Sequence, residues 1–305
     1  MTPSHITVIL NPVAGRGKAR HIHAALLTAL EHSGIDHTFQ VTAARGHATE
    51  LAKAAAASSS IVVAVGGDGT VNEVASGLVG TDAALAVMSE GSGNDFARMV
   101  AAPSDPARLI GLLRDPVIAS YDVGAVKMLH GDGEISRRHF FNSVGLGFDA
   151  AVARKVSSIT WMRGIPLYLT ALLRTLSGYK PHYFTVRCNG AHWQKFYFLL
   201  CVGNGKWEGG GFKLTPNAVP DDGQFEVCGV TGTSILKILP VLPSVMTGTH
   251  LGKKNIESFD TAQLFVHDPK GFPVHGDGEI FGWQVIQAEI TLLPRALRVV
   301  MPHTA

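Results

Sequence analysis

The residues best suited to chemistry form a glycine-rich run with one aspartate in its middle, Gly66-Gly67-Asp68-Gly69-Thr70. A strand-like run, Ile61 to Val65, comes directly before it, and a helix-like run follows. Glycine takes positive φ and brings backbone N–H groups against phosphate oxygens, and a helix N-terminus adds a favourable dipole. A carboxylate tolerates a neighbouring polyphosphate when a cation or a substrate hydroxyl lies between them. The run therefore predicts a phosphate-binding turn in which Asp68 binds magnesium or handles a proton. An ordinary glycine-rich turn with a capping aspartate has the same local pattern.

Two further turns have a similar composition and a similar place in the chain. Residues Asn11 to Lys18 follow a strand-like run at Ile6 to Leu10, and residues Gly91 to Arg98 follow Leu85 to Met88. In a parallel sheet the carboxyl ends of the strands share one edge, so the three loops would converge on an anion the size of a nucleoside triphosphate. Neither turn contains G-x-x-x-x-G-K-[ST] or G-x-G-x-x-G, which disfavours hydride chemistry on a dinucleotide.

The elements that position these loops change in character near residue 120. Before residue 118, strand-like and helix-like runs alternate, which predicts a mostly parallel sheet covered on both faces. Beyond Tyr121, short runs with alternating polarity are separated by Gly and Asp turns, which predicts antiparallel structure. We therefore expect an α/β domain over residues 1–120 and a β-rich domain over 121–294, with residues 295–305 packing back on the first.

Two helix-like insertions interrupt the β-rich part, at residues 150–177 and 234–246. Both carry apolar residues at i, i+3 and i+4 spacing. One interpretation is that both apolar faces belong to the core. The other is that at least one of them forms a lipid-facing surface with a basic rim.

The composition narrows the class of protein. With 46% hydrophobic and 16% charged residues the chain is too apolar for intrinsic disorder, and its net charge of +2 is far from that of a dedicated nucleic-acid binder. Its three cysteines, Cys188, Cys201 and Cys228, are widely spaced and predict buried thiols in a reducing compartment. We find no signal peptide pattern and no apolar run of about 18 residues, so we expect a cytoplasmic protein.

In order and spacing, these motifs resemble the bacterial diacylglycerol kinase and lipid kinase family, whose relatives include the sphingosine and ceramide kinases. The resemblance covers nearly the whole length of the chain. The matching segments are Asn11 to Lys18, Thr42 to Ala48, Gly66 to Glu73, Gly91 to Arg98, Asn142 to Asp149, Asn204 to Gly211, Pro216 to Phe225 and Asp277-Gly278-Glu279. The resemblance implies a doubly wound first domain like that of phosphofructokinase and NAD kinase, and a second domain that is mainly an antiparallel β-sandwich with helical insertions.

The resemblance also implies where ATP binds. The positions that match the family's nucleotide contacts are Asn11, Pro12, Val13, Ala14, Gly15, Thr42, Gly67, Asp68, Gly69, Thr70, Val71, Asn72, Glu73 and Ser92. Ser92 stands where the family usually has threonine, and it keeps the hydroxyl. Ser89-Glu90 replaces the family's usual Pro-x-Gly, which is a departure from the pattern next to the nucleotide.

The catalytic and metal residues are likewise implied by the family. Glu279 matches the glutamate that accepts the proton of the acceptor hydroxyl, and Asp68 is the alternative base, because relatives of the sphingosine kinase type use the aspartate of the glycine-rich loop. Val219, Asp222 and Gln224 match a structural Mg²⁺ loop that uses one carboxylate and two main-chain carbonyls, although Asp-Asp-Gly is also a common turn. His275 directly precedes the Asp-Gly-Glu motif and could tune Glu279.

These implications predict an ATP- and Mg²⁺-dependent kinase that binds peripherally to a membrane and converts diacylglycerol to phosphatidic acid. A sphingoid-base or ceramide kinase and an NAD kinase-like enzyme remain alternatives. A nucleotide-responsive lipid-binding protein without catalysis is the alternative of a different class. We expect no nucleic-acid partner, and the sequence leaves a homodimer open.

Overall fold

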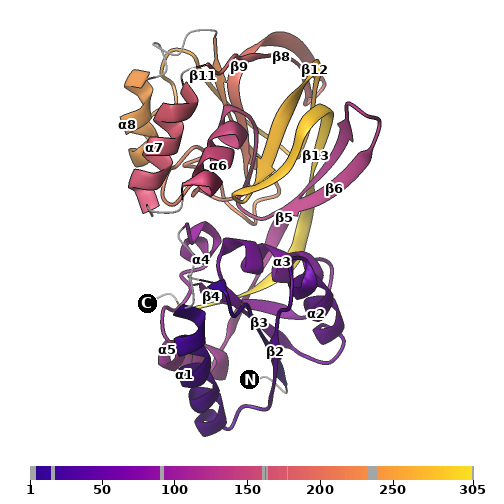
Figure 1. Cartoon of the computed structure of the whole chain (residues 1–305). Helices are drawn as coiled ribbons and strands as arrows, with labels where there is room; N and C mark the ends of the chain where they lie inside the picture. The colour runs from indigo at the N-terminus through magenta and orange to yellow at the C-terminus, as the bar shows by residue number, and fades with distance from the viewer. Residues whose placement is uncertain are drawn as a thin grey trace. The chain divides into compact units, whose positions relative to one another are not determined.

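A computed structural model describes residues 5–14, 18–89, 93–159, 162, 164–176, 178–232 and 239–303 (Figure 1). The chain divides into two compact units. Unit 1 comprises residues 1–121 and 295–305, and unit 2 comprises residues 122–294.

Unit 1 is built on a parallel sheet. Its strands are β1 (Ile6–Leu10), β2 (His37–Val41), β3 (Ile61–Gly66) and β4 (Ala84–Ser89), in the order β2-β1-β3-β4. Every residue of β1 and β3 is buried, whereas the edge strand β2 is partly exposed. Burial on both faces explains why the inner strands have uninterrupted apolar sequences. The sheet confirms the parallel arrangement predicted from the alternating runs.

Helices cover the sheet of unit 1. Helices α1 (Lys18–Ser33) and α5 (Pro106–Arg114) share a core with alternate residues of β1, β3 and β4. Helix α2 (His47–Ala55) packs against α3 (Asp68–Leu78), and α3 packs against β3 and β4. The short helix α4 (Asp95–Met99) follows β4. The last part of the long strand β13 (Glu279–Met301) adds to β4 in parallel through Arg298 and Val299.

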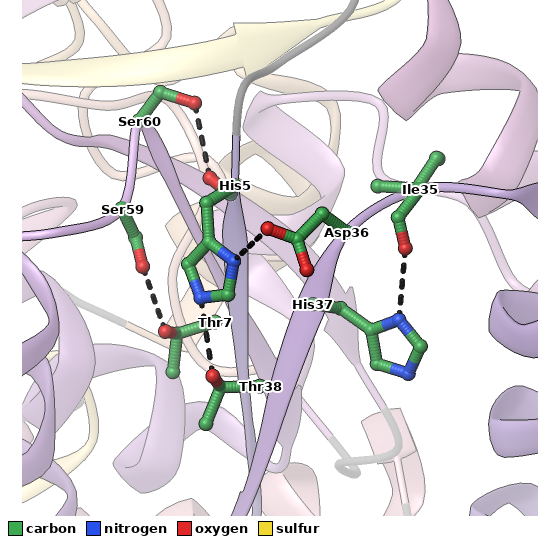
Figure 2. A network of polar contacts seen from close by, with 8 residues as sticks. All are labelled: His5, Thr7, Ile35, Asp36, His37, Thr38, Ser59 and Ser60. Atoms are coloured by element: carbon green, nitrogen blue, oxygen red, sulfur yellow. Dashed lines mark hydrogen bonds and ion pairs between the residues drawn. The ribbon is translucent and has the colours of Figure 1, made fainter.

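A polar network fixes the amino ends of the first strands (Figure 2). His5 Nδ1 lies 2.9 Å from Asp36 Oδ2, and its Nε2 lies 3.1 Å from Thr38 Oγ1, so this ring links β1 to the start of β2. The hydroxyls of Thr7 and Ser59 lie 2.7 Å apart and link β1 to the residues before β3. The contacts lie at the amino ends, which leaves the carboxyl ends for the glycine-rich loops.

Unit 2 is a mainly antiparallel sheet. Its remaining strands are β5 (Val117–His130), β6 (Ile135–Phe140), β7 (Ser143–Gly147), β8 (His182–Cys188), β9 (Ala191–Gly203), β10 (Phe225–Thr231), β11 (Ile256–Thr261) and β12 (Gln263–Gly276). Both β7 and β8 pair with β9 and β12, at different ends of these two long strands. β7 and β8 therefore share one position in the sheet, end to end.

The chain between β7 and β8 forms the first helical insertion. It contains α6 (Phe148–Ser158) and α7 (Gly164–Leu176), and the 3₁₀ helix η3 (Leu239–Val241) and α8 (Leu242–Thr247) belong to the second insertion. Phe148, Val152 and Leu167 pack with Phe198 and Leu199 of β9 in a second core of this unit. Part of the first apolar face is thus core, and the three cysteines are buried free thiols as predicted.

In the portion of the chain that the structure covers, we find no helix with both the length and the apolar character needed to cross a membrane.

The contact between α2 and α3 gives a test of the packing in unit 1. A Cβ added at Gly77 would lie 2.6 Å from Thr49 O and 2.7 Å from Ala52 Cβ, whereas one added at Gly111 of α5 would meet nothing within 4 Å. We expect Gly77→Ala to lower the free energy of unfolding by about 1–2 kcal/mol, because backbone must move. Gly111→Ala should raise it by about 0.5–1 kcal/mol through helix propensity. Urea unfolding measures both, and a Gly77→Ala protein as stable as the parent would contradict the packing described.

Candidate active site

The loop after β1 is tied to the glycine-rich turn in unit 1. Asn11 Nδ2 donates to Thr70 Oγ1 at 3.0 Å, and Asn11 Oδ1 accepts the backbone N–H of Val13 at 3.1 Å. The Asn11 N–H also donates to the carbonyl of Val65 at 2.9 Å. Asn11 therefore stabilises its own turn and links the loop after β1 to the loop after β3.

Asp68 joins the turn after β3 to the loop after β4. Its two carboxylate oxygens accept the backbone N–H groups of Asn94 and Asp95 at 3.1 and 3.2 Å, at the start of α4. Asn94 has a positive φ of 55°, and its side-chain oxygen accepts the Ser89 hydroxyl at 2.6 Å. A non-glycine residue in this conformation usually needs such local support. The side chain of Asp68 thus has a fixed position at the carboxyl edge of the sheet.

The other described residues expected to bind nucleotide lie in the loops after β1 and β2 and in helix α3 or directly before it. Thr42 follows β2 and donates its backbone N–H to the carbonyl of Leu10 at 2.9 Å. The Glu73 carboxylate accepts backbone N–H groups of Gly46 and Ala48 at 2.8 and 3.3 Å, at the start of α2. The turn after β1 contains Pro12, Val13 and Ala14. Gly67 precedes α3, and this helix contains Gly69, Thr70, Val71 and Asn72. Two of the expected residues, Gly15 and Ser92, lie outside the described residues. The structure brings the loops after β1, β3 and β4 together through side-chain contacts.

The Asp-Gly-Glu motif forms the turn between β12 and β13 in unit 2. Asp277 and Gly278 have φ values of 50° and 82°, and Gly276 pairs with Glu279, as in a two-residue type I′ hairpin. The Asp277 carboxylate accepts the backbone N–H groups of Phe141, Asn142 and Ser143 at 2.7, 2.9 and 3.1 Å. Glu279, the first residue of β13, is half-buried. Asp277 therefore fixes the place from which Glu279 projects.

An apolar pocket opens beside this turn, within unit 2. Its wall includes Gly278 and apolar side chains of α6, α7, β9, β10, β11 and the second insertion, among them Phe148, Val152, Leu172, Phe198, Leu199 and Val245. A pocket lined in this way binds hydrocarbon better than a charged nucleotide.

Three ionisable side chains also line the pocket and form a buried polar cluster of Asp149, Glu208 and His275. His275 Nε2 lies 3.3 Å from Asp149 Oδ2 and 3.1 Å from Glu208 Oε1, and the His275 side chain is only 3% exposed. Burial opposes protonation of His275, but Asp149 and Glu208 outweigh it and raise its pKa to about 10. Burial also raises the pKa of Asp149, whereas for Glu208 the bonds from His275 overcome burial and lower the pKa. We therefore treat His275 as an imidazolium at neutral pH.

The expected magnesium loop lies at an exposed turn of unit 2. Asp222 Oδ1 accepts the backbone N–H of Gln224 at 2.9 Å, and Val219 is 38% exposed. The turn is anchored by the buried Asp122, whose Oδ2 accepts the Gly223 N–H at 2.8 Å. A carboxylate with neighbouring carbonyls is a donor set of hard oxygens, so the residues present fit Mg²⁺.

Sequence reasoning gave Asp149 and Glu208 no role, and linked His275 only to Glu279. Asp149 is the second residue of α6, and His275 is the last residue but one of β12. Glu208 lies between Trp207 and three glycines. A charged residue next to a glycine cluster was the available signal. Asp122 and Asp277 were also missed as the anchors of their turns.

Comparison with known proteins adds independent evidence. Residues 5–126 match a family model described as the diacylglycerol kinase catalytic domain, and residues 142–301 match one described as the YegS C-terminal NAD kinase beta sandwich-like domain. A diacylglycerol kinase of Mycobacterium tuberculosis is 28% identical over 98% of this chain and 95% of its own length. A Pseudomonas fluorescens protein named "Probable lipid kinase YegS-like" is 30% identical over 92% of this chain and 90% of its own.

A crystal structure of a diacylglycerol kinase from Bacillus anthracis shares the fold. Its TM-score is 0.72 at 20% identity, and the match covers 99% of this chain and 98% of that one. The two family models match both units described above. This chain therefore belongs to the diacylglycerol kinase and YegS-like lipid kinase family, and it is a phosphotransferase that acts on an alcohol acceptor.

Proposed function

We propose that this enzyme transfers the γ-phosphoryl group of Mg²⁺-ATP to the free hydroxyl of diacylglycerol, which yields phosphatidic acid and ADP. The observation that carries the proposal is the apolar pocket of unit 2, whose wall includes Gly278, the residue before Glu279. A hydrocarbon-binding pocket beside a carboxylate suits a lipid alcohol.

Unit 1 would hold the nucleotide at the carboxyl edge of its parallel sheet, where ligands bind in doubly wound folds. Backbone N–H groups of the loops at Asn11 to Gly15 and Gly67 to Glu73 would bind phosphate oxygens, with the Ser92 hydroxyl beside them. Asp68 would hold the catalytic Mg²⁺, for which the fixed position of its carboxylate is an advantage. Magnesium bound there would offset the negative charge that moves between the β- and γ-phosphates.

Glu279 would act as the general base. Its carboxylate accepts the proton of the lipid hydroxyl while the hydroxyl oxygen forms a bond to the γ-phosphorus and the bond from that phosphorus to the bridging oxygen of ADP breaks. Asp68 is the alternative base. The assignment favours Glu279 because its neighbour Gly278 lines the apolar pocket, whereas Asp68 is engaged with the start of α4.

The helices of unit 2 support peripheral binding to a membrane. Leu172 of α7 and Val245 of α8 line the pocket, and their neighbours Leu173 and Met246 are 52% and 40% exposed. Exposed apolar residues next to pocket-lining ones would let a lipid pass between bilayer and pocket with little contact with water. An NAD kinase-like activity is disfavoured because the pocket offers an acceptor few polar groups.

Replacement of Glu279 tests the base. Glu279→Gln keeps the size of the side chain but accepts no proton, so kcat for diacylglycerol should fall by roughly 10²- to 10⁴-fold. ATP affinity, measured by calorimetry, should stay unchanged because the nucleotide contacts belong to unit 1. Glu289→Gln, on the same strand and 38% exposed, is the matched control and should retain activity. Full activity of Glu279→Gln would exclude this role.

Magnesium at the second site is tested by thermal unfolding. Because a ligand that binds only the folded state stabilises it, Mg²⁺ should raise Tm of the parent protein in the absence of nucleotide. Asp222→Ala should abolish most of this rise, while Asp221→Ala, one residue away, should preserve it. An equal Mg²⁺ response in the parent and in Asp222→Ala would show that Asp222 does not bind the ion.

A further inference from the structure

The buried polar cluster of Asp149, Glu208 and His275 stands out in a pocket that is otherwise apolar. Moving ionised groups out of water costs free energy that their mutual attraction offsets only when every polar atom finds a partner. Three polar atoms do not: among the described residues, Asp149 Oδ2 and both ring nitrogens of His275 are buried without a hydrogen-bond partner. The ion-pair distances from the His275 ring to Asp149 and Glu208 both run to Nε2, and neither runs to Nδ1. A buried imidazolium N–H without an acceptor is destabilising, so an acceptor from a bound molecule would complete the cluster.

The surrounding backbone makes room for this cluster. Gly145 of β7 pairs with His275 of β12, and a Cβ at Gly145 would clash with the Asp149 carboxylate and with the His275 ring. Any side chain at this position would therefore displace the cluster. The three residues come from different parts of unit 2, since Asp149 lies in α6, Glu208 lies beyond β9 and His275 is the last residue but one of β12.

The hydrogen-bonding capacity of the cluster indicates its ligand. Both carboxylates lie at ion-pair distance from Nε2 of His275, which leaves the Nδ1–H as the ring donor without an acceptor beside it. An ester carbonyl oxygen is such an acceptor, and it sits close to the free hydroxyl of an acylglycerol. An ether-linked lipid of the same chain length has no carbonyl oxygen.

We propose that Asp149, Glu208 and His275 form the subsite for the ester backbone of the acceptor lipid, with the Nδ1–H of His275 donating to an ester carbonyl oxygen. His275 is a positioning and specificity residue, and the two carboxylates orient its ring. The inference rests on the proposed function, because it assumes that the pocket holds a lipid. Beyond that function, it specifies that the pocket selects lipids with an ester linkage.

The experiment compares two lipids that differ only in this carbonyl. Dioleoylglycerol and its dialkyl ether analogue are presented in mixed micelles, and kcat/KM is measured for each. A hydrogen bond to a charged donor is worth enough to favour the ester by roughly tenfold or more. The triple variant D149N/E208Q/H275L removes all three charges together, so no charge remains buried alone, and it should treat the two lipids alike.

A matched control separates the subsite from general stability. His182 lies 3.2 Å from the buried Asp268 in the same unit, yet neither residue lines the pocket. The variant His182→Asn therefore also removes a histidine–carboxylate pair and should keep the preference for the ester. If the triple variant fails to fold in a thermal unfolding experiment, E208Q/H275L serves in its place, because Asp149 can remain protonated there.

A binding measurement distinguishes failure of this inference from failure of the proposed function. Analogues that lack the reacting hydroxyl, in ester and ether forms with brominated chains, are titrated while tryptophan fluorescence is followed. Tighter binding of the ester that disappears in the triple variant supports the subsite even if no lipid is phosphorylated. Equal binding of the two analogues by the parent protein, or a preference that survives in the triple variant, overturns it. Stoichiometric Zn²⁺ binding that requires these three residues would also overturn it, since the cluster would then be a metal site.

Discussion

The loops of this enzyme depend on hydrogen bonds that backbone N–H groups donate to fixed carboxylates. Asp277 accepts three such groups from residues 141–143, Asp68 accepts two at the start of α4, and Glu73 accepts two at the start of α2. Each bond satisfies donors that a turn or a helix start leaves without a partner. Because a charged acceptor strengthens each bond, the loops hold their shape without regular secondary structure. The residues proposed to do chemistry, Asp68 and Glu279, are positioned by these contacts.

In unit 2, an apolar pocket is built onto an antiparallel sheet. β7 and β8 share one position between β9 and β12, so the chain leaves the sheet midway and returns after α6 and α7. These helices lie over β9 and pack on Phe198 and Leu199, which belong both to a core and to the pocket wall. The insertion therefore contributes residues such as Phe148 and Val152 to a core and to the pocket wall at once. The core interpretation of its apolar face is thus confirmed in part, and contact of that face with lipid stays a prediction.

The sequence predicts features formed by residues that are close together in the chain better than features formed by residues that are far apart in it. The inner strands of unit 1 were predicted because burial on both faces requires continuous apolar runs, and β1 matches the expected residues Ile6 to Leu10. The glycine-rich turns were found because they are local in sequence. The buried polar cluster could not be predicted in this way, because Asp149, Glu208 and His275 are separated by dozens of residues. They come together only through the pairing of β7, β9 and β12. Similarly, nothing local marks Asp277 or Asp122 as an anchor. For all of the expected nucleotide contacts, binding stays a prediction from sequence, and Gly15 and Ser92 in addition lie outside the described residues.

In the proposed reaction a lipid hydroxyl, and no other alcohol, receives the phosphoryl group. The most direct measurement incubates the enzyme with γ-labelled ATP, Mg²⁺ and a total lipid extract to which NAD has been added, and then locates the label. We expect the label to enter the organic phase as the phosphomonoester of a neutral glycerolipid. Label on NAD alone, or label that stays on ATP and free phosphate while no lipid acquires any, would contradict it.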